Sequence, residues 1–429
     1  MAMNQITNTL RHIIKTKSLR DKILFTIAML VLFRMLAHIT IPGADVSGIK
    51  SLIDQQGQSV LGVFSVLTGG AMENFSVALM GLTPYINAAI IMQLLAVIVP
   101  KLENLKKEGE AGQKKISQYT RILTVPLAFA QSYGMMVLIN RFSPTQIVDT
   151  GDFSVMLPMM LTVTAGTMLL VWIGELISEK GIGNGISLLI FAGIVSIVPN
   201  QIAGSFMSAS LPLILVLAAA TAALTIFVVY VLEADRKVPV VYASKKSAQQ
   251  QRSFLPLKIN QAGMIPIIFA ISIISFPSIV GQILVDNPNL SGVSDWIGAN
   301  LNPASPTLIY NVIYFLLIYG FTFFYVSIVF DPKKMAENIQ KRSGFIPGYR
   351  PGTETENLLE SIMNRLCFWG ALFLASVAIL PLLFQQFLGG GNSVALFISG
   401  AGIIIVVSVV LDLIRRINAH LVMHDYDKL

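Results

Sequence analysis

Residues 181–232 read GIGNGISLLIFAGIVSIVPNQIAGSFMSASLPLILVLAAATAALTIFVVYVL, a run of 52 residues that contains no Asp, Glu, Lys or Arg. A membrane-spanning helix needs roughly 20 apolar residues, so this run is too long for one span and long enough for two. The breakers Pro199-Asn200-Gln201 and Pro212 predict the turn between the two. Basic residues flank the run at Lys180 and from Arg236 onward. Because Lys and Arg collect on the cytoplasmic side of membrane helices, both ends of this helical pair are predicted to be cytoplasmic.

The same alternation of apolar runs and basic connections extends over the whole chain. Of the 30 Lys and Arg residues, 27 lie on alternate connecting segments, and the exceptions are Lys50, Arg141 and Arg34. This sorting predicts that both chain ends are cytoplasmic and that the number of spans is even. The charge-free runs give ten spans, at residues 23–41, 75–99, 122–139 and 153–174, two within 181–232, then 259–285, one that ends at Phe330, and two between Leu366 and Leu411.

The composition independently indicates a membrane protein. Hydrophobic residues make up 54% of the chain and charged residues only 12%, whereas charged residues are roughly 25% of a soluble domain. The net charge of +7 lies on the predicted cytoplasmic connections, where orientation alone requires it, so it does not indicate bulk binding of nucleic acid. The single cysteine, Cys367, excludes a disulfide within the chain. No small-residue cleavage site follows the first apolar run, so we expect this span to be retained.

Ten spans divide into two sets of five, carried by residues 1–202 and 203–429. An odd number of spans in each half turns the second half upside down relative to the first, as in many transporters. No residue-level repeat accompanies this parity. We therefore predict an all-α polytopic membrane protein of two pseudo-symmetric inverted halves, with the functional path between them.

One apolar segment is too short to cross the membrane. Residues 61–70, LGVFSVLTGG, follow the first predicted span and end in Gly-Gly on the predicted external side. Such a segment is either a re-entrant half-helix or an interfacial loop, and its residues alone leave both open. A re-entrant segment requires burial in protein or a water-filled cavity, because irregular backbone is tolerated at membrane depth only there.

The ionisable residues within the predicted spans do not form a catalytic or ion-coupling site. Arg34, Glu175 and Asp412 are expected to snorkel or to cap helices near span ends, and no acidic pair marks the membrane midplane. Residues 109–115 lack P-loop spacing. The glycines of residues 181–185 are expected to make a tight turn between helices rather than a dinucleotide site. The sequence therefore favours neither an enzyme nor an ion-coupled transporter, and it predicts no cofactor and no metal ion.

Four segments carry a family resemblance. They are residues 81–86 (GLTPYI), which run into 91–95 (IMQLL), residues 179–187 (EKGIGNGIS), residues 255–263 (LPLKINQAG) and residues 343–352 (SGFIPGYRPG), the last preceded by Phe330-Asp331-Pro332. In this order, across essentially the whole chain, they resemble the SecY family, whose members form the central subunit of the bacterial protein-conducting channel.

The resemblance implies a plug and a pore constriction. Segment 61–72 is similar to the family's plug helix, which closes the channel from outside, and this favours the re-entrant alternative. Its plug residues are Leu61, Gly62, Val63, Phe64, Ser65, Val66, Leu67, Thr68, Gly69 and Gly70. By local motif matching the constriction residues are Leu82 and Ile86 in the second span, Ile190 in the fifth, Ile268 in the seventh and Ile405 in the tenth. All five are large aliphatics, which by themselves indicate only core packing.

The resemblance also implies a lateral gate between the second and seventh spans, beside the third and eighth. Its polar residues are Thr83, Asn87, Gln93 and Ser272, for which ordinary interhelical hydrogen bonding is the alternative. The large cytoplasmic connections, residues 235–260 and 331–364, are expected to dock the ribosome or the SecA motor ATPase. The docking residues are Arg350, Lys245, Lys246, Arg252 and Lys258, for which orientation alone is the alternative.

By this resemblance the chain is expected in the plasma (inner) membrane, where it would translocate unfolded secretory proteins and release transmembrane segments sideways. The expected partners are the small membrane subunits SecE and SecG, SecA, the ribosome, signal peptides, unfolded preproteins and membrane lipid. Two alternatives remain open. An inverted-repeat secondary transporter of small solutes is disfavoured by the lack of midplane acids and by the two shaped basic connections. An accessory SecY paralogue for special substrates is the other.

Overall fold

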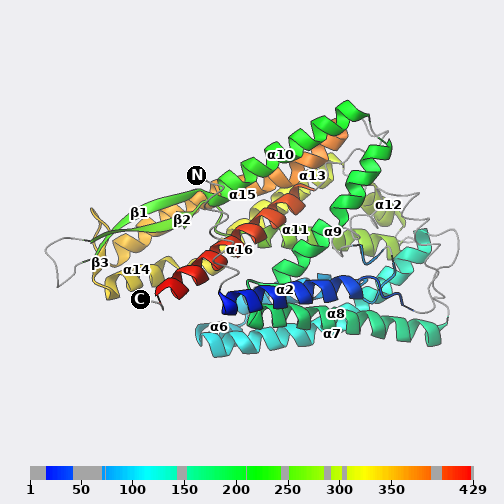
Figure 1. Ribbon diagram of the computed structural model, residues 1–429, viewed down its shortest axis with the longest axis horizontal. Helices are drawn as coiled ribbons and strands as arrows, with labels where there is room; N and C mark the ends of the chain where they lie inside the picture. The colour runs from blue at the N-terminus through cyan, green and yellow to red at the C-terminus, as the bar shows by residue number, and fades with distance from the viewer. Residues whose placement is uncertain are drawn as a thin grey trace.

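Figure 1 shows a computed structural model of the chain, an elongated bundle of helices with a small β-sheet at one end. Helix α2 (Lys17–Leu36) begins, and helix α16 (Gly400–Tyr426) ends, toward the end of the bundle that carries the sheet. The structure describes residues 16–41, 70–72, 74–142, 152–208, 210–242, 251–284, 291–301, 307–387 and 399–426.

Each of the ten predicted spans overlaps one helix. Within the described residues, five helices are long and apolar enough to cross a membrane, or six if a bent helical pair is counted as one span. The total of ten spans therefore remains a prediction, with which the arrangement agrees. The helices that overlap the predicted spans are α2, α5 (Thr83–Ile98), α7 (Glu110–Phe142), α8 (Phe153–Lys180), α9 (Gly185–Ser208), α10 (Leu211–Glu233), α11 (Ile265–Leu284), α13 (Leu308–Val329), α15 (Thr353–Phe387) and α16.

The break between α9 and α10 differs from the predicted turn. Helix α9 continues through Pro199 as far as Ser208, and α10 begins at Leu211 with Pro212 in its first turn. A proline within a membrane helix is tolerated because neighbouring groups satisfy the backbone carbonyl that it frees. A proline in the first turn lacks only an N–H that has no partner there anyway. The predicted turn at Pro199-Asn200-Gln201 was therefore wrong, whereas Pro212 does mark the start of a helix.

The second predicted span contains a shorter helix than its apolar run suggested. Residues 77–82 form turns, and α5 begins only at Thr83. Phe75 has a φ of 42°, which lies in the left-handed region and is incompatible with a right-handed helix. At its other end α5 meets α6 (Pro100–Lys107) with a bend of 99°. Val99 is extended at this bend, as expected for a residue that precedes proline.

A three-stranded sheet, which the sequence did not predict, joins the two large connections. Strand β1 (Asp235–Tyr242) pairs antiparallel with β2 (Gln251–Lys258) on one side and with β3 (Gly344–Phe345) on the other. Val238 and Val240 point to the buried face of β1. Because β3 comes from the second connection, the two connections form one body, with α14 (Pro332–Lys341) in contact with β3.

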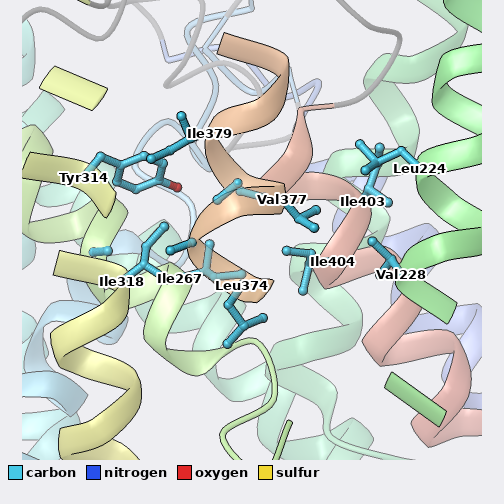
Figure 2. Packing of buried hydrophobic residues seen from close by; sticks show 14 of the residues in the cluster. Leu224, Val228, Ile267, Tyr314, Ile318, Leu374, Val377, Ile379, Ile403 and Ile404 are labelled. Carbon is cyan, nitrogen blue, oxygen red and sulfur yellow. The ribbon is translucent and has the colours of Figure 1, made fainter. Parts of the chain in front are cut away.

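Four clusters of buried side chains hold the structure together. One lies within residues 41–163, a second within residues 224–407 (Figure 2), and a third lies beneath the sheet. The fourth contains side chains from both predicted halves, from Phe33 to Val409. The predicted boundary after residue 202 falls inside α9 rather than between helices. The division into inverted halves remains a prediction.

Candidate functional site

An open cavity of about 670 Å³ lies between helices of both predicted halves. Its walls come from α5, α8, α11 and α16 and from the turn between α8 and α9. Charged side chains on α16, Asp412 and Arg416, line it together with Ile86, Ile190 and Ile268. Since a helix rises about 1.5 Å per residue, Asp412 and Arg416 lie roughly 10 to 16 Å along α16 from Ile405. The cavity is therefore polar at its mouth, near the sheet, and aliphatic deeper in the bundle.

The five aliphatic residues predicted for the constriction come together in the cluster that both halves share. Leu82, Ile190 and Ile405 are buried, and Ile86 and Ile268 pack against them. Leu82 is the N-cap residue of α5 and Ile86 lies in its first turn, whereas the other three come from α9, α11 and α16. Of the five, Ile86, Ile190 and Ile268 line the cavity. We call these five residues the collar.

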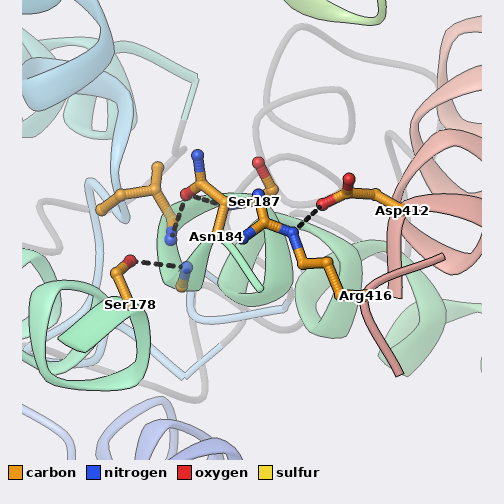
Figure 3. A network of polar contacts seen from close by, with 7 residues as sticks. Ser178, Asn184, Ser187, Asp412 and Arg416 are labelled. Atoms are coloured by element: carbon orange, nitrogen blue, oxygen red, sulfur yellow. Dashed lines mark hydrogen bonds and ion pairs between the residues drawn. The ribbon is translucent and has the colours of Figure 1, made fainter. Parts of the chain in front are cut away.

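A tight turn between α8 and α9 positions Ile190. Gly185 lies so close to α8 that an added Cβ would be 1.9 Å from the carbonyl oxygen of Gly174, a contact that only glycine avoids. The Gly185 N–H donates to Ser178 Oγ at 2.8 Å (Figure 3). Asn184 Oδ1 accepts from the N–H groups of Ile186 and Ser187 at 3.1 and 3.3 Å and caps α9. The predicted tight turn is confirmed.

The charges around the mouth are neutralised in pairs. Arg121 Nη1 lies 3.0 Å from Glu175 Oε2, and Arg416 Nε lies 2.9 Å from Asp412 Oδ2 (Figure 3). Arg415 on α16 reaches Glu233 on α10 at 3.3 Å. Glu175 and Asp412, which were expected to snorkel or to cap helices near span ends, each form an ion pair. The cavity mouth is thus charged without a strong excess of either sign.

Arg34, which was also expected to snorkel or to cap a helix, has a partner on another helix. Its Nη1 donates to Ser196 Oγ at 2.9 Å, which joins α2 to α9. The Ser196 hydroxyl donates in turn to the Gly193 carbonyl at 2.7 Å. The guanidinium therefore has an interhelical partner within the bundle, which lowers the cost of a cation at membrane depth.

Asn260 fixes the entry to α11. Its Oδ1 accepts from the Gly263 N–H at 3.0 Å, and its Nδ2 donates to the Gly263 carbonyl at 3.1 Å. Gly263 has a φ of +64°, which favours glycine. Gly370 on α15 lies close to the same entry, since an added Cβ would be 2.6 Å from the Ile259 carbonyl oxygen. These contacts set the start of α11 and hence the position of Ile268.

The predicted gate residues fall on two faces of α5 and on α11. Helix α5 contacts α7 and α11, and α11 contacts α13, as the expected gate requires. Gln93 lines the cavity, seven positions after Ile86 on the same helical face, and its buried Oε1 has no hydrogen-bond partner. Thr83, Asn87 and Ser272 do not line the cavity. Gln93 is therefore separated from the other three.

Gln131 and Ser408 are among the buried polar residues that the sequence did not single out. Gln131 Oε1 on α7 and Ser408 Oγ on α16 are buried and have no hydrogen-bond partner. Ser408 also lines the cavity, three residues from Ile405. A lone polar residue within an apolar membrane helix is the signal that could have identified both.

Most of the predicted plug lies outside the described residues. Of the ten plug residues only Gly70 is described, in a turn with a φ of 77°. The next residue, Ala71, is fully buried in the same cluster as the collar. Leu61 to Gly69 are not described. The chain that follows the predicted plug therefore reaches the collar, and the role of the plug stays a prediction.

Of the predicted docking residues, the structure describes the side chains of Arg350 and Lys258, which lie in different surroundings. Arg350 lies exposed at a turn whose shape depends on its backbone, because its N–H donates to Glu354 Oε2 and its carbonyl accepts from Thr355 Oγ1, both at 2.9 Å. Lys258 lines the cavity instead, where burial and then the neighbouring Arg415 hold its pKa below the ordinary value. The backbone of Arg252 lies in β2 opposite Val241. Lys245 and Lys246 lie outside the described residues.

A cavity lined by charged and by aliphatic side chains, inside a bundle of apolar helices, is typical of a helical membrane channel. Residues 76–414 match the family model for SecY, and this chain belongs to the SecY family. The protein translocase subunit SecY of Halalkalibacterium halodurans is 41% identical, and the match covers 97% of this chain and 98% of the relative. The same subunit of Thermotoga maritima is 39% identical over 97% of this chain and 96% of its own length.

Solved structures of channels share the fold. A protein-conducting channel has a TM-score of 0.65 at 17% identity, over 93% of this chain and 92% of its own. A SecY protein, described for a plug domain that stabilises its closed state, has a TM-score of 0.67 at 18% identity and the same coverage. Sec61 in a canine ribosome–channel complex scores 0.62 at 17% identity, again over 93% and 92%. At these identities the likeness concerns the fold alone.

Proposed function

We propose that this chain is the channel subunit of a Sec-type protein translocase, which passes unfolded proteins across the membrane and releases apolar segments into lipid. The observation that carries the proposal is the collar at the bottom of a polar cavity, in a member of the SecY family. Relatives over nearly the full length are protein translocase subunits. A small-solute transporter requires a specific polar site near the midplane, whereas the cavity here narrows to aliphatic side chains.

The energetics of the substrate explain why such a path is needed. Each Asp, Lys or Arg at the membrane centre costs roughly 2.5 to 3.5 kcal/mol, so an unfolded chain with about thirty charges would face on the order of 100 kcal/mol. A polar cavity removes most of this cost. A narrow apolar collar is poorly wetted, so it resists ions and water at rest and still yields to a passing peptide. Residues 61–72 would add a plug behind the collar.

Sideways release requires a seam that opens toward lipid. Our proposal places this gate between α5 and α11, which contact each other, with α7 and α13 beside them. Thr83, Asn87 and Ser272 would weaken the apolar seal of the seam, and Gln93 would face the peptide in the cavity. An unpaired amide oxygen in a low-dielectric seam favours any state in which it gains a partner. A polar peptide or water entering the seam would supply that partner.

The driving partner is proposed to dock at the end of the bundle that carries the sheet. Arg350 is exposed there, and no described residue forms an ion pair with it. A guanidinium at a turn shaped by Gly348 and Gly352 suits bidentate recognition of a carboxylate. The proposed partners are SecA or the ribosome at this surface, with SecE and SecG in the membrane. The proposed location is the plasma membrane, with both termini in the cytoplasm.

The collar can be tested by ion conductance. The full translocase would be reconstituted in planar bilayers with Ile405→Asn, and with Ile226→Asn as a matched control on a side chain that is 70% exposed on α10. A polar group in the collar favours wetting, so Ile405→Asn should raise the resting conductance or relax the requirement for a signal sequence. Ile226→Asn should do neither. Unchanged conductance together with unchanged substrate selection for Ile405→Asn would refute the collar assignment.

The solute-transporter and paralogue alternatives need a separate test. The chain would be purified in mild detergent, its co-purifying proteins identified, and the complex assayed in vesicles for protease protection of an unfolded preprotein. A small single-span subunit, a motor ATPase and protection that depends on ATP support the translocase. A homo-oligomer that moves a small solute would overturn it. Protection restricted to a narrow set of preproteins would identify an accessory paralogue.

A further inference from the structure

Helix α12 (Ser291–Asn300) has three chemically different faces. Successive residues of a helix are turned by about 100°, so Ser294, Ile297 and Leu301 share one face, which is the buried or partly buried one. Val293 and Trp296 share a second face, and each is 52% exposed. The third face carries exposed Asp295 and Ala299 together with glycines. A ten-residue helix is too short to cross a membrane.

The buried face fixes α12 rigidly to the end of α11. Ser294 Oγ donates to the Gly281 carbonyl at 2.6 Å. Gly281 is small enough for this approach, since an added Cβ would lie 2.7 Å from Ile297 Cγ2. Gly281 and Ser294 are on the two sides of the connection between the helices, so α12 cannot tilt away from α11 without breaking a buried hydrogen bond.

The other end of α12 is fixed to the start of α13. Thr307 Oγ1 donates to the Asn300 carbonyl at 2.9 Å and also caps α13 by accepting from the Tyr310 N–H at 3.2 Å. The side-chain amide of Asn300 donates to the Trp296 carbonyl at 3.0 Å. Two hydrogen bonds therefore link the backbone of Trp296 through Asn300 to Thr307, the residue before Leu308. In Figure 1, α12 lies at the end of the bundle opposite the sheet.

Helix α13, to which α12 is bonded, carries a stripe of exposed apolar side chains. Leu308 is 74% exposed, and Val312 and Leu316, which follow at intervals of four residues, are 49% and 59% exposed. In a membrane helix such a stripe faces hydrocarbon. Leu308 is the first residue of the stripe and adjoins Thr307, which is bonded to α12. Helix α12 is thus bonded to the end of α13 at which this stripe begins.

We propose that α12 lies in the lipid headgroup region at the end of the bundle opposite the sheet, with Val293 and Trp296 inserted toward the acyl chains and Asp295 in water. Tryptophan is enriched at this depth because its ring is apolar and its indole N–H is polar. An amphipathic helix with separate polar and apolar faces binds in the plane of the interface. Helix α12 thereby anchors the ends of α11 and α13 to the bilayer. This surface would bind lipid whatever passes through the cavity.

The depth of each face can be measured by spin labelling of the complete translocase in vesicles of phosphatidylethanolamine and phosphatidylglycerol. In a Cys367→Ala background, the label would be attached at Val293→Cys, with Ala299→Cys on the water face of the same helix as the matched control. Ile309→Cys, on the exposed side of α13, supplies a second reference. Oxygen concentrates in lipid and a nickel chelate stays in water. The label at 293 should resemble that at 309, with high access to oxygen, whereas the label at 299 should favour the nickel chelate.

Native Trp296 provides an independent measurement if a labelled variant folds poorly. In a Trp172→Phe, Trp369→Phe chain, Trp296 is the only tryptophan of this subunit. Its emission should be quenched by lipids brominated near the carbonyl region and protected from aqueous iodide. Quenching by iodide and not by lipid would overturn the proposal, because the face would then be in water. Protection from both would also overturn it, because a protein rather than lipid would cover α12.

Discussion

Two of the four cores of this protein are built from different side chains. The cluster within residues 41–163 contains seven methionines among its twelve buried residues. The cluster within residues 224–407 contains no methionine and consists of Ile, Leu, Val, Ala and Tyr (Figure 2). Methionine is unbranched and adapts to changes of shape, whereas β-branched side chains have few rotamers. The first core should therefore deform more easily than the second.

The position of each core suits this difference. Met72 in the first core is the last residue of segment 61–72, the predicted plug, which we expect to move when the channel opens. The second core includes residues of α11, α13 and α15, and the sheet and its cluster adjoin α13 and α15. A stiff core transmits displacement between packed elements. We interpret the first core as the yielding side of the channel and the second as the side that transmits force.

The largest expected effect comes from the same truncation in both cores. Leu374 and Met136 are both fully buried. Leu374→Ala should lower stability by about 4 kcal/mol, because rigid neighbours cannot fill the cavity, whereas Met136→Ala should cost about 2 kcal/mol, because the surrounding methionines can. The loss of stability of each variant can be measured by thermal unfolding in detergent, with an aggregation assay that does not depend on thiol chemistry as the readout. Equal losses would contradict the difference in stiffness.

A charge reversal at the proposed docking surface should have the next largest effect. Arg350→Glu would replace attraction to a partner carboxylate by repulsion, which we expect to lower motor-driven export roughly thirtyfold, equivalent to about 2 kcal/mol. Insertion and folding of the chain should be unchanged, because the Arg350 side chain stabilises nothing else in the described structure. Arg342→Glu, another exposed arginine of the same connection, should export normally. Full export by Arg350→Glu would show that the driving partner does not dock through Arg350.

The cap of α14 should make the stiff side sensitive to acid. The Lys334 backbone N–H donates to Asp331 Oδ1 at 3.1 Å and holds the pKa of Asp331 below its ordinary value. The cap therefore stabilises α14 fully above a pH of about 4 and less as the pH falls through the lowered pKa. Asp331→Ala should cost about 1 kcal/mol, and Asp331→Asn, which keeps a capping oxygen, should lose the pH dependence with little loss of stability. Hydrogen exchange of α14 at pH 3 and pH 7 would distinguish the three chains.

The smallest expected effect tests whether the deformability of the methionine-rich core affects channel opening. Replacing Met136, Met159 and Met160 by Leu conserves volume, so the free energy of unfolding should change by less than about 1.5 kcal/mol per site. Channel opening should nevertheless slow, by roughly threefold in the rate of preprotein translocation, because a stiffer core resists displacement of the neighbouring plug. The control is Leu374→Met in the other core, which should leave the rate unaltered. If the triple variant translocates preprotein as fast as the parent, the methionines contribute only packing volume and not deformability.

Hydropathy and charge predicted the helices well because burial in lipid depends mainly on composition. Each predicted span overlaps a helix, and the tight turn at residues 181–185 is where the glycines indicated. The predicted turn at Pro199 was wrong because the same proline that ends a helix in water is tolerated inside a membrane helix. The composition of residues 75–82 also looked helical, although Phe75 and Gly81 both have a positive φ and α5 begins only at Thr83.

Contacts between segments that are distant in the chain could not be predicted from the sequence. The alternation of Val238 and Val240 could have suggested strand β1, but nothing local indicates that residues 344–345 pair with it. The collar depended entirely on the family resemblance, because an isoleucine in an apolar helix has no distinguishing mark. Only the packed structure brings these five side chains into one cluster, and it also separates Gln93 from the other gate residues.

The pairing of β1 with β3 also constrains how this protein can be recombined with its relatives. Tyr242 pairs with Gly344, and an added Cβ on that glycine would lie 2.8 Å from the tyrosine ring. A chimera that exchanges only one of the two large connections would therefore join a strand to a partner selected for another edge. Both connections must be transplanted together, so the unit of modular exchange in this part of the molecule is discontinuous in the chain.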